Sequence, residues 1–144
     1  MKERRKWAFI LDKDEFVRLS LNKILKKYGF QTEEIEDFSQ LEKRKKDVDG
    51  GMILADVEID VLEKDFPFLK RWNDRFVLMT PLVTDELAFR LKKMGIHRVM
   101  KKPVDPRLLR KVIREISFSD GEKAPSFGKK GEGSHFIQKG GEVL

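Results

Sequence analysis

The chain has 144 residues, carries a formal net charge of +6 and contains no cysteine. Its length is typical of one domain, and its 40% of hydrophobic residues is enough to build a buried core. The lack of cysteine excludes disulfide bonds, thiolate zinc sites and a cysteine nucleophile. No segment approaches the run of about 18 apolar residues that a membrane helix needs. The basic first residues lack the features of a signal peptide, so we expect a cytoplasmic protein.

Charge and glycine content divide the chain into two parts. Residues 117–144 contain four acidic residues and four lysines, so the excess positive charge lies entirely in residues 1–116. The same C-terminal segment holds six of the ten glycines, and its apolar residues follow neither a helical nor a strand period. We therefore expect a folded domain over 1–116 and a Gly/Lys-rich flexible extension over 117–144.

Short apolar runs alternate with helical patterns through the first 116 residues. Each run is bounded by charged or glycine residues and has the length of a buried strand, whereas the intervening segments carry apolar residues three and four positions apart. Strands are predicted over 7–11, 31–36, 52–56, 75–80 and 97–101, and helices over 17–28, 38–46, 61–72, 85–94 and 106–116.

Four residues are expected to mark helix ends. Thr84 and Asp105 are of the types that cap helix N-termini, and Gly29 is suited to the residue that follows a helix. Pro67 is expected to shorten or break the helix predicted over 61–72, because proline has no backbone N–H to donate.

The alternation of strands and helices predicts an α/β fold with a doubly wound parallel sheet. Strands that are apolar throughout are covered on both faces, and right-handed crossovers place helices on both sides of the sheet. In such folds, ligands bind in the crevice at the carboxyl ends of the strands. The residues that end the predicted strands are therefore the candidate functional residues.

Carboxylates, a hydroxyl and an ammonium stand at these strand ends. A carboxylate can act as a nucleophile, and hydroxyl and ammonium groups can bind the oxygens of a transferred phosphoryl group. The combination predicts a site that handles phosphoryl groups. Its residues are Asp12, Lys13 and Asp14 after the first strand, Asp56 at the third, Thr80 at the fourth and Lys102 after the fifth.

At these positions the sequence resembles the receiver domain of response regulators in two-component signalling. The resemblance covers residues 7–116 and rests on the segments FILDKDEFVRLSLNKILKKYGF, MILAD, VLMT and GIHRVMKKPVD. It implies a flavodoxin-like sheet of five parallel strands in the order 2-1-3-4-5. It also implies a phosphorelay role, with no enzyme activity beyond phosphoryl chemistry on the protein's own aspartate.

The resemblance assigns roles to individual residues. Asp56 matches the phosphoacceptor, Thr80 the switch hydroxyl and Lys102 the phosphate-binding lysine. Asp12, Asp56 and the backbone carbonyl of Glu58 match the ligands of Mg²⁺. The Lys102–Pro103 bond matches a cis peptide, which is inexpensive only before proline.

The resemblance also implies partners. A sensor histidine kinase or a phosphotransfer protein would donate the phosphoryl group, and an output partner would bind the face formed by the fourth and fifth helices. That face is rich in lysine and arginine, but acidic residues interrupt the basic ones and no nucleic-acid-binding motif occurs. An acidic protein partner is therefore expected in preference to nucleic acid.

Lys13 departs from the receiver pattern, which has a second metal-binding carboxylate at this position. An ammonium here removes a ligand and repels Mg²⁺, so the expected metal site is weakened. Two interpretations are open. In one, the ammonium lies among Asp12, Asp56 and Glu58 in place of the metal, and the domain acts as an unphosphorylated interaction module. In the other, Lys13 points to solvent and the remaining ligands bind Mg²⁺ weakly.

A third interpretation is an enzyme. The run I-L-D-K-D also resembles the first motif of haloacid-dehalogenase-type phosphatases, in which Asp12 would be the nucleophile and Asp14 the general acid and base. Thr80 and Lys102 would match later motifs of that family. This interpretation leaves Asp56 without a role, and the acidic pair that such a phosphatase needs after the lysine is missing.

Overall fold

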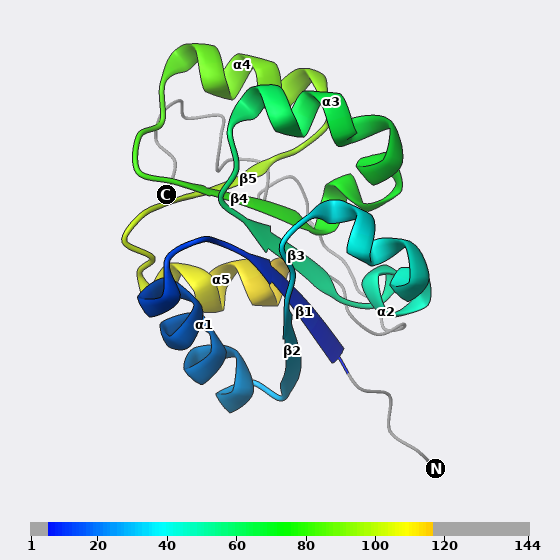
Figure 1. The fold of residues 1–144 in the computed structure, drawn as a ribbon. Helices are drawn as coiled ribbons and strands as arrows, with labels where there is room; N and C mark the ends of the chain where they lie inside the picture. The colour runs from blue at the N-terminus through cyan, green and yellow to red at the C-terminus, as the bar shows by residue number, and fades with distance from the viewer. Residues whose placement is uncertain (1–5, 117–144) are drawn as a thin grey trace.

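Five parallel strands form one sheet in the order β2-β1-β3-β4-β5 (Figure 1). The structure is a computed structural model and describes residues 6–116, so the extension expected over 117–144 lies outside it. The arrangement confirms the predicted α/β class and the flavodoxin-like strand order. The strands are β1 (Lys6–Leu11), β2 (Phe30–Glu34), β3 (Met52–Ala55), β4 (Phe76–Thr80) and β5 (Arg98–Lys101).

Helices cover both faces of the sheet, as predicted. Helices α1 and α5 lie on one face, and α2, α3 and α4 lie on the other (Figure 1). No helix among residues 6–116 is long and apolar enough to cross a membrane. The helical elements are α1 (Glu15–Lys27), η1 (Phe38–Arg44), α2 (Lys45–Asp49), α3 (Ile59–Leu69), η2 (Lys70–Arg75), α4 (Asp85–Lys93) and α5 (Pro106–Glu115), where η denotes a 3₁₀ helix.

The apolar runs of the strands form two cores, one on each side of the sheet. Along β1, Phe9 and Leu11 join the core under α2, α3 and α4, while Ala8 and Ile10 join the core under α1 and α5. Successive side chains of a strand point to opposite faces, so a strand covered on both sides must be apolar at every position. The whole of β3 (Met52–Ala55) is buried for this reason.

The predicted caps of the last two helices are confirmed. The Thr84 hydroxyl accepts a hydrogen bond from the Leu87 N–H at 3.1 Å, and the Asp105 carboxylate accepts one from the Arg107 N–H at 2.8 Å. The peptide bond between Lys102 and Pro103 is cis, as the resemblance implied.

The second helical segment differs from the single helix expected over 38–46. It begins as η1 (Phe38–Arg44) and ends as the short α2 (Lys45–Asp49). The start of η1 is fixed by a capping box, in which the Asp37 carboxylate accepts the Ser39 N–H at 2.7 Å and the Gln40 side chain accepts the Asp37 N–H at 3.1 Å. These local bonds favour a tight first turn.

Pro67 shortens the helix expected over 61–72 without breaking it, so the first of the two expected effects is the one seen. Helix α3 continues through Pro67 to Leu69, and the chain then tightens into η2. A proline in the last turn removes only one hydrogen bond, and tertiary contacts offset this loss. Among these contacts, the buried Trp72 of η2 donates its indole N–H to Asp49 at 2.7 Å.

Gly51 fits the entry to β3 only because it lacks a side chain. A Cβ atom at this position would lie 2.1 Å from the carbonyl oxygen of Trp7 and 2.9 Å from that of Asp47.

We predict that Gly51→Ala lowers the free energy of unfolding by about 2 kcal/mol or more, measured by urea unfolding. Gly50→Ala is the matched control, since nothing lies within 4 Å of its Cβ position. Its expected effect is below about 0.5 kcal/mol, and equal losses from both substitutions would contradict this explanation.

Candidate functional site

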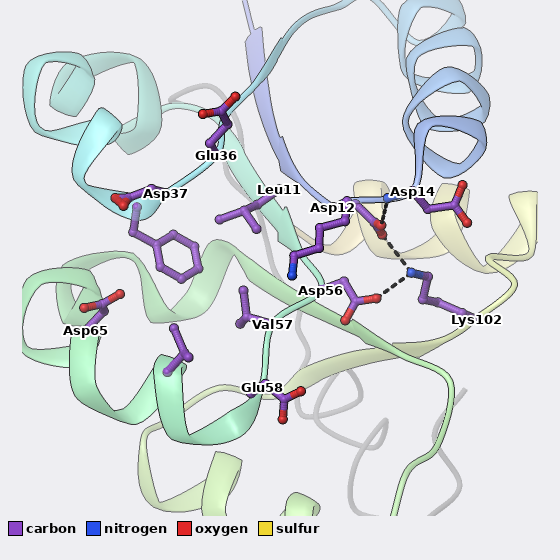
Figure 2. Close-up of a pocket in the computed structure, with 13 residues that line it drawn as sticks. Leu11, Asp12, Asp14, Glu36, Asp37, Asp56, Val57, Glu58, Asp65 and Lys102 are labelled. Carbon is purple, nitrogen blue, oxygen red and sulfur yellow. Dashed lines mark hydrogen bonds and ion pairs between the residues drawn. The ribbon is translucent and has the colours of Figure 1, made fainter.

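The carboxyl ends of β1, β3 and β5 bring three predicted site residues together (Figure 2). Leu11 pairs with Ala55 in the sheet, so the residues that follow them, Asp12 and Asp56, lie next to each other. The Asp56 N–H donates to the Leu11 carbonyl at 2.9 Å, which fixes this register at the edge of the sheet. Lys102 reaches the pair from the residue after β5.

The Lys102 ammonium bridges the two carboxylates. Its Nζ lies 2.8 Å from Asp12 Oδ2 and 2.5 Å from Asp56 Oδ2. The Asp12 side chain is only 2% exposed, whereas that of Asp56 is 31% exposed. Burial alone would lower the pKa of Lys102, but its hydrogen bonds to Asp12 and Asp56 and their negative charges raise that pKa above its ordinary value. Lys102 therefore carries its positive charge at neutral pH.

The second oxygen of Asp56 is available for chemistry. Lys102 binds Oδ2, and no residue among 6–116 donates a hydrogen bond to Oδ1. Asp56 opens onto a pocket of about 520 Å³ between β1, η1 and α3. The charged side chains that line this pocket are Asp12, Asp14, Glu36, Asp37, Asp56, Glu58, Asp65, Lys13 and Lys102.

Lys13 lies on this pocket without touching its carboxylates. The side chain is exposed and forms no hydrogen bond or ion pair with any residue that the structure describes. The ammonium that contacts Asp12 and Asp56 is that of Lys102. Lys13 thus lines the pocket that contains Asp12, Asp56 and Glu58 without a hydrogen bond or ion pair to any of them.

Asp14 is occupied with the start of α1. Its Oδ1 accepts hydrogen bonds from the N–H groups of Phe16 at 2.8 Å and Val17 at 3.4 Å. Figure 2 shows its carboxylate turned away from Asp56. A capping carboxylate in this position is poorly placed to act as the general acid of a phosphatase.

Glu58 and Thr80 are bonded within their own segments. The Glu58 carbonyl, expected to face a metal, accepts the N–H groups of Val61 at 3.0 Å and Leu62 at 3.1 Å in the first turn of α3. Thr80 ends β4 at the same edge of the sheet, but its hydroxyl donates to the Leu82 carbonyl at 3.2 Å and is not part of the pocket wall.

The oxygen atoms around Asp56 do not form a ready-made magnesium site among residues 6–116. Each oxygen of Asp12 already has a hydrogen-bond donor, since Oδ1 accepts the Asp14 N–H at 2.9 Å and Oδ2 accepts Lys102. The Glu58 carbonyl already accepts hydrogen bonds from N–H groups in the first turn of α3. No group of three or more histidine or carboxylate side chains suited to a metal ion occurs within residues 6–116. Mg²⁺ binds carboxylate and water oxygens in an octahedron, so at this site it would compete with Lys102 and the Asp14 N–H for the oxygens of Asp12.

Sequence reasoning missed Arg18 as a support of the site. Its guanidinium donates to the Asp12 carbonyl at 2.9 Å and pairs with Glu34 at 3.2 Å, which holds the segment that carries Asp12 and Lys13. An arginine on a charged helix face gives no sequence signal for this role. Asp37 was also missed as part of the pocket wall, although its capping-box spacing to Gln40 was visible in the sequence.

Solved structures of receiver domains share this fold. The response regulator StyR has a TM-score of 0.63 at 20% identity, with 78% of this chain and 59% of StyR covered. The chemotaxis protein CheY4 of Vibrio cholerae has a TM-score of 0.62 at 20% identity, with 78% and 99% covered. The beryllofluoride-activated NtrC4 receiver domain has a TM-score of 0.62 at 21% identity, with 76% and 95% covered.

The comparisons establish the fold at low sequence identity. This chain spans 59% of the length of StyR and nearly all of CheY4. No family model matches the sequence, and no curated protein matches it. The chain therefore has the fold of response-regulator receiver domains.

Removing Lys102 should destabilise the protein by leaving the Asp12 carboxylate buried without a cation. We predict that Lys102→Met lowers the free energy of unfolding by about 2 kcal/mol or more. Lys101→Met, at the exposed neighbouring position, is the control and should change it by less than about 0.5 kcal/mol. Asp12→Asn combined with Lys102→Met should recover part of the loss.

The pH dependence of this effect follows from the raised pKa of Lys102. A raised pKa in the folded state means that the contribution of Lys102 is complete below its ordinary value of 10.5. The contribution is lost as the pH rises through the higher folded value. The difference in stability between wild type and Lys102→Met should therefore be constant from pH 7 to about pH 10. A difference that disappears near neutral pH would contradict the ion-pair geometry.

Proposed function

We propose that this chain is a receiver-type signalling module in which Asp56 accepts a phosphoryl group from a sensor histidine kinase or a phosphotransfer protein. One observation carries the proposal. Asp56 stands at the carboxyl end of β3 with one oxygen bound to Lys102 and the other open to a pocket. The chain as a whole has the fold of solved receiver domains.

The transfer step uses the unbonded oxygen of Asp56. Oδ1 attacks the phosphorus of a phosphohistidine, the P–N bond breaks, and its electron pair leaves with the imidazole nitrogen, which takes a proton from water. An acyl phosphate on Asp56 remains. Lys102 stays protonated, and its ammonium can bind the phosphoryl oxygens as negative charge moves onto them from the carboxylate. The contact with the buried Asp12 carboxylate keeps the Lys102 ammonium at the site during this step.

Thr80 would connect the phosphoryl group to a partner-binding face. Its hydroxyl must exchange the Leu82 carbonyl for a phosphoryl oxygen, which alters the loop that leads into α4. Leu82 and Phe89 are 66% and 59% exposed on this loop and helix. We expect a change here to alter binding of an output partner on the face of α4 and α5.

Direct labelling tests the proposal. The full-length protein is incubated with phosphoramidate or acetyl phosphate, with and without Mg²⁺, and the bound phosphoryl group is measured by intact-protein mass spectrometry. We expect one phosphoryl group per chain, its loss in Asp56→Asn, and its retention in Asp65→Asn, a matched change at another carboxylate of the same pocket.

Two outcomes would reject phosphoacceptor function. They are the absence of labelling in wild type under every condition, and equal labelling of wild type and Asp56→Asn.

The absence of labelling would favour a second candidate function, that of an unphosphorylated interaction module. It is favoured by the existing neutralisation of Asp56 by Lys102. Such a module would bind its partner equally well as wild type and as Asp56→Asn.

A further inference from the structure

The pocket beside Asp56 carries more negative than positive groups. Seven carboxylates line the pocket, together with two ammoniums. Two of those carboxylates, on Asp14 and Asp37, accept backbone N–H groups as helix caps. The buried carboxylate, Asp12, has a donor on each oxygen. The remaining pocket is still acidic, so a diffusible cation would be attracted to it unless something opposes its entry.

Lys13 is placed to oppose that entry. It follows Asp12 directly, lines the same pocket as Asp56 and Glu58, and also lines the adjoining pocket beside Arg18 and Glu34. It has no hydrogen bond or ion pair with a described residue that would hold its ammonium elsewhere. A charge tethered in the lining of a pocket acts at all times, whereas a free ion must first bind from solution.

The segment that carries Lys13 is held in place. Arg18 donates to the Asp12 carbonyl at 2.9 Å, and the Asp14 N–H donates to Asp12 Oδ1 at 2.9 Å. Bonds on both sides of residue 13 leave its backbone little freedom. A side chain at this position must therefore project from a fixed point beside the carboxylates of Asp12 and Asp56.

We propose that the ammoniums of Lys13 and Lys102 supply the positive charge of this pocket in place of a divalent cation, and that Lys13 excludes such cations. Lys102 neutralises the inner pair, Asp12 and Asp56, by contact. Lys13 repels a doubly charged ion from the rest of the same pocket. The proposal depends on the proposed function only in treating Asp56 as the working carboxylate.

A reversal of charge at position 13 is the sharpest test. Lys13→Asp replaces a repelling ammonium with an oxygen ligand beside Asp12 and Asp56, so it should create a divalent-cation site. Lys23→Asp makes the same change of two charge units at an exposed position of α1 that lines a different pocket. Lys13→Arg retains the charge and should behave as wild type.

Binding is measured on the full chain with Mn²⁺ by electron paramagnetic resonance and with Mg²⁺ by calorimetry. We expect Lys13→Asp to bind both ions at least about tenfold more tightly than wild type, and Lys23→Asp to change the affinity by less than about twofold. Wild-type affinity equal to that of Lys13→Asp would overturn the proposal. An equal gain in Lys23→Asp would also overturn it, because net charge alone would then explain the result.

The outcome is independent of phosphoryl labelling. If Lys13→Asp gains cation affinity but wild type cannot be labelled at Asp56, the inference stands and the phosphoacceptor role fails. If wild type is labelled only when Mg²⁺ is present and binds that ion as tightly as Lys13→Asp does, the phosphoacceptor role stands and the inference fails.

Discussion

The buried carboxylate of Asp12 is the constraint on which the functional edge of the sheet depends. A charge removed from water is tolerated only when hydrogen bonds and an opposite charge compensate it. Here the Asp14 N–H and the Lys102 ammonium do so, at 2.9 Å and 2.8 Å. Since Lys102 comes from the end of β5, this single contact ties the first strand to the last across β3 and β4. The same ammonium also contacts Asp56 Oδ2 and so holds the Asp56 carboxylate beside that of Asp12.

Much of the fold was predictable because its signals are local. Buried strands covered on both faces must be apolar at every position, which made β1, β3 and β4 visible as short runs. Thr84 and Asp105 could be identified as caps, since a capping side chain bonds to residues only two or three positions away. The carboxyl ends of parallel strands share one edge, so the proximity of Asp12 and Asp56 followed from the strand pattern.

Details that depend on side-chain rotation or on distant contacts were not predictable. The sequence placed Thr80 at the correct edge but could not show that its hydroxyl bonds to Leu82. It left open whether Pro67 would shorten or break its helix, and the helix continues to Leu69 because packing in the folded protein offsets one lost hydrogen bond. The support that Arg18 gives to the Asp12 carbonyl depends on the angle between α1 and β1, which no residue pattern specifies.

The difference between a tethered and a diffusible counter-ion gives position 13 its importance. A pocket that relies on a free metal ion changes its charge with the concentration of that ion, and its carboxylates repel one another whenever the ion is absent. A pocket that contains its own ammoniums keeps these positive charges whatever the concentration of metal ions. Lys102 can then bind both carboxylates continuously, which is the geometry observed. Under the proposed function, the chain itself thus holds Lys102 beside the carboxylate of Asp56 that would accept the phosphoryl group, before any phosphoryl donor arrives.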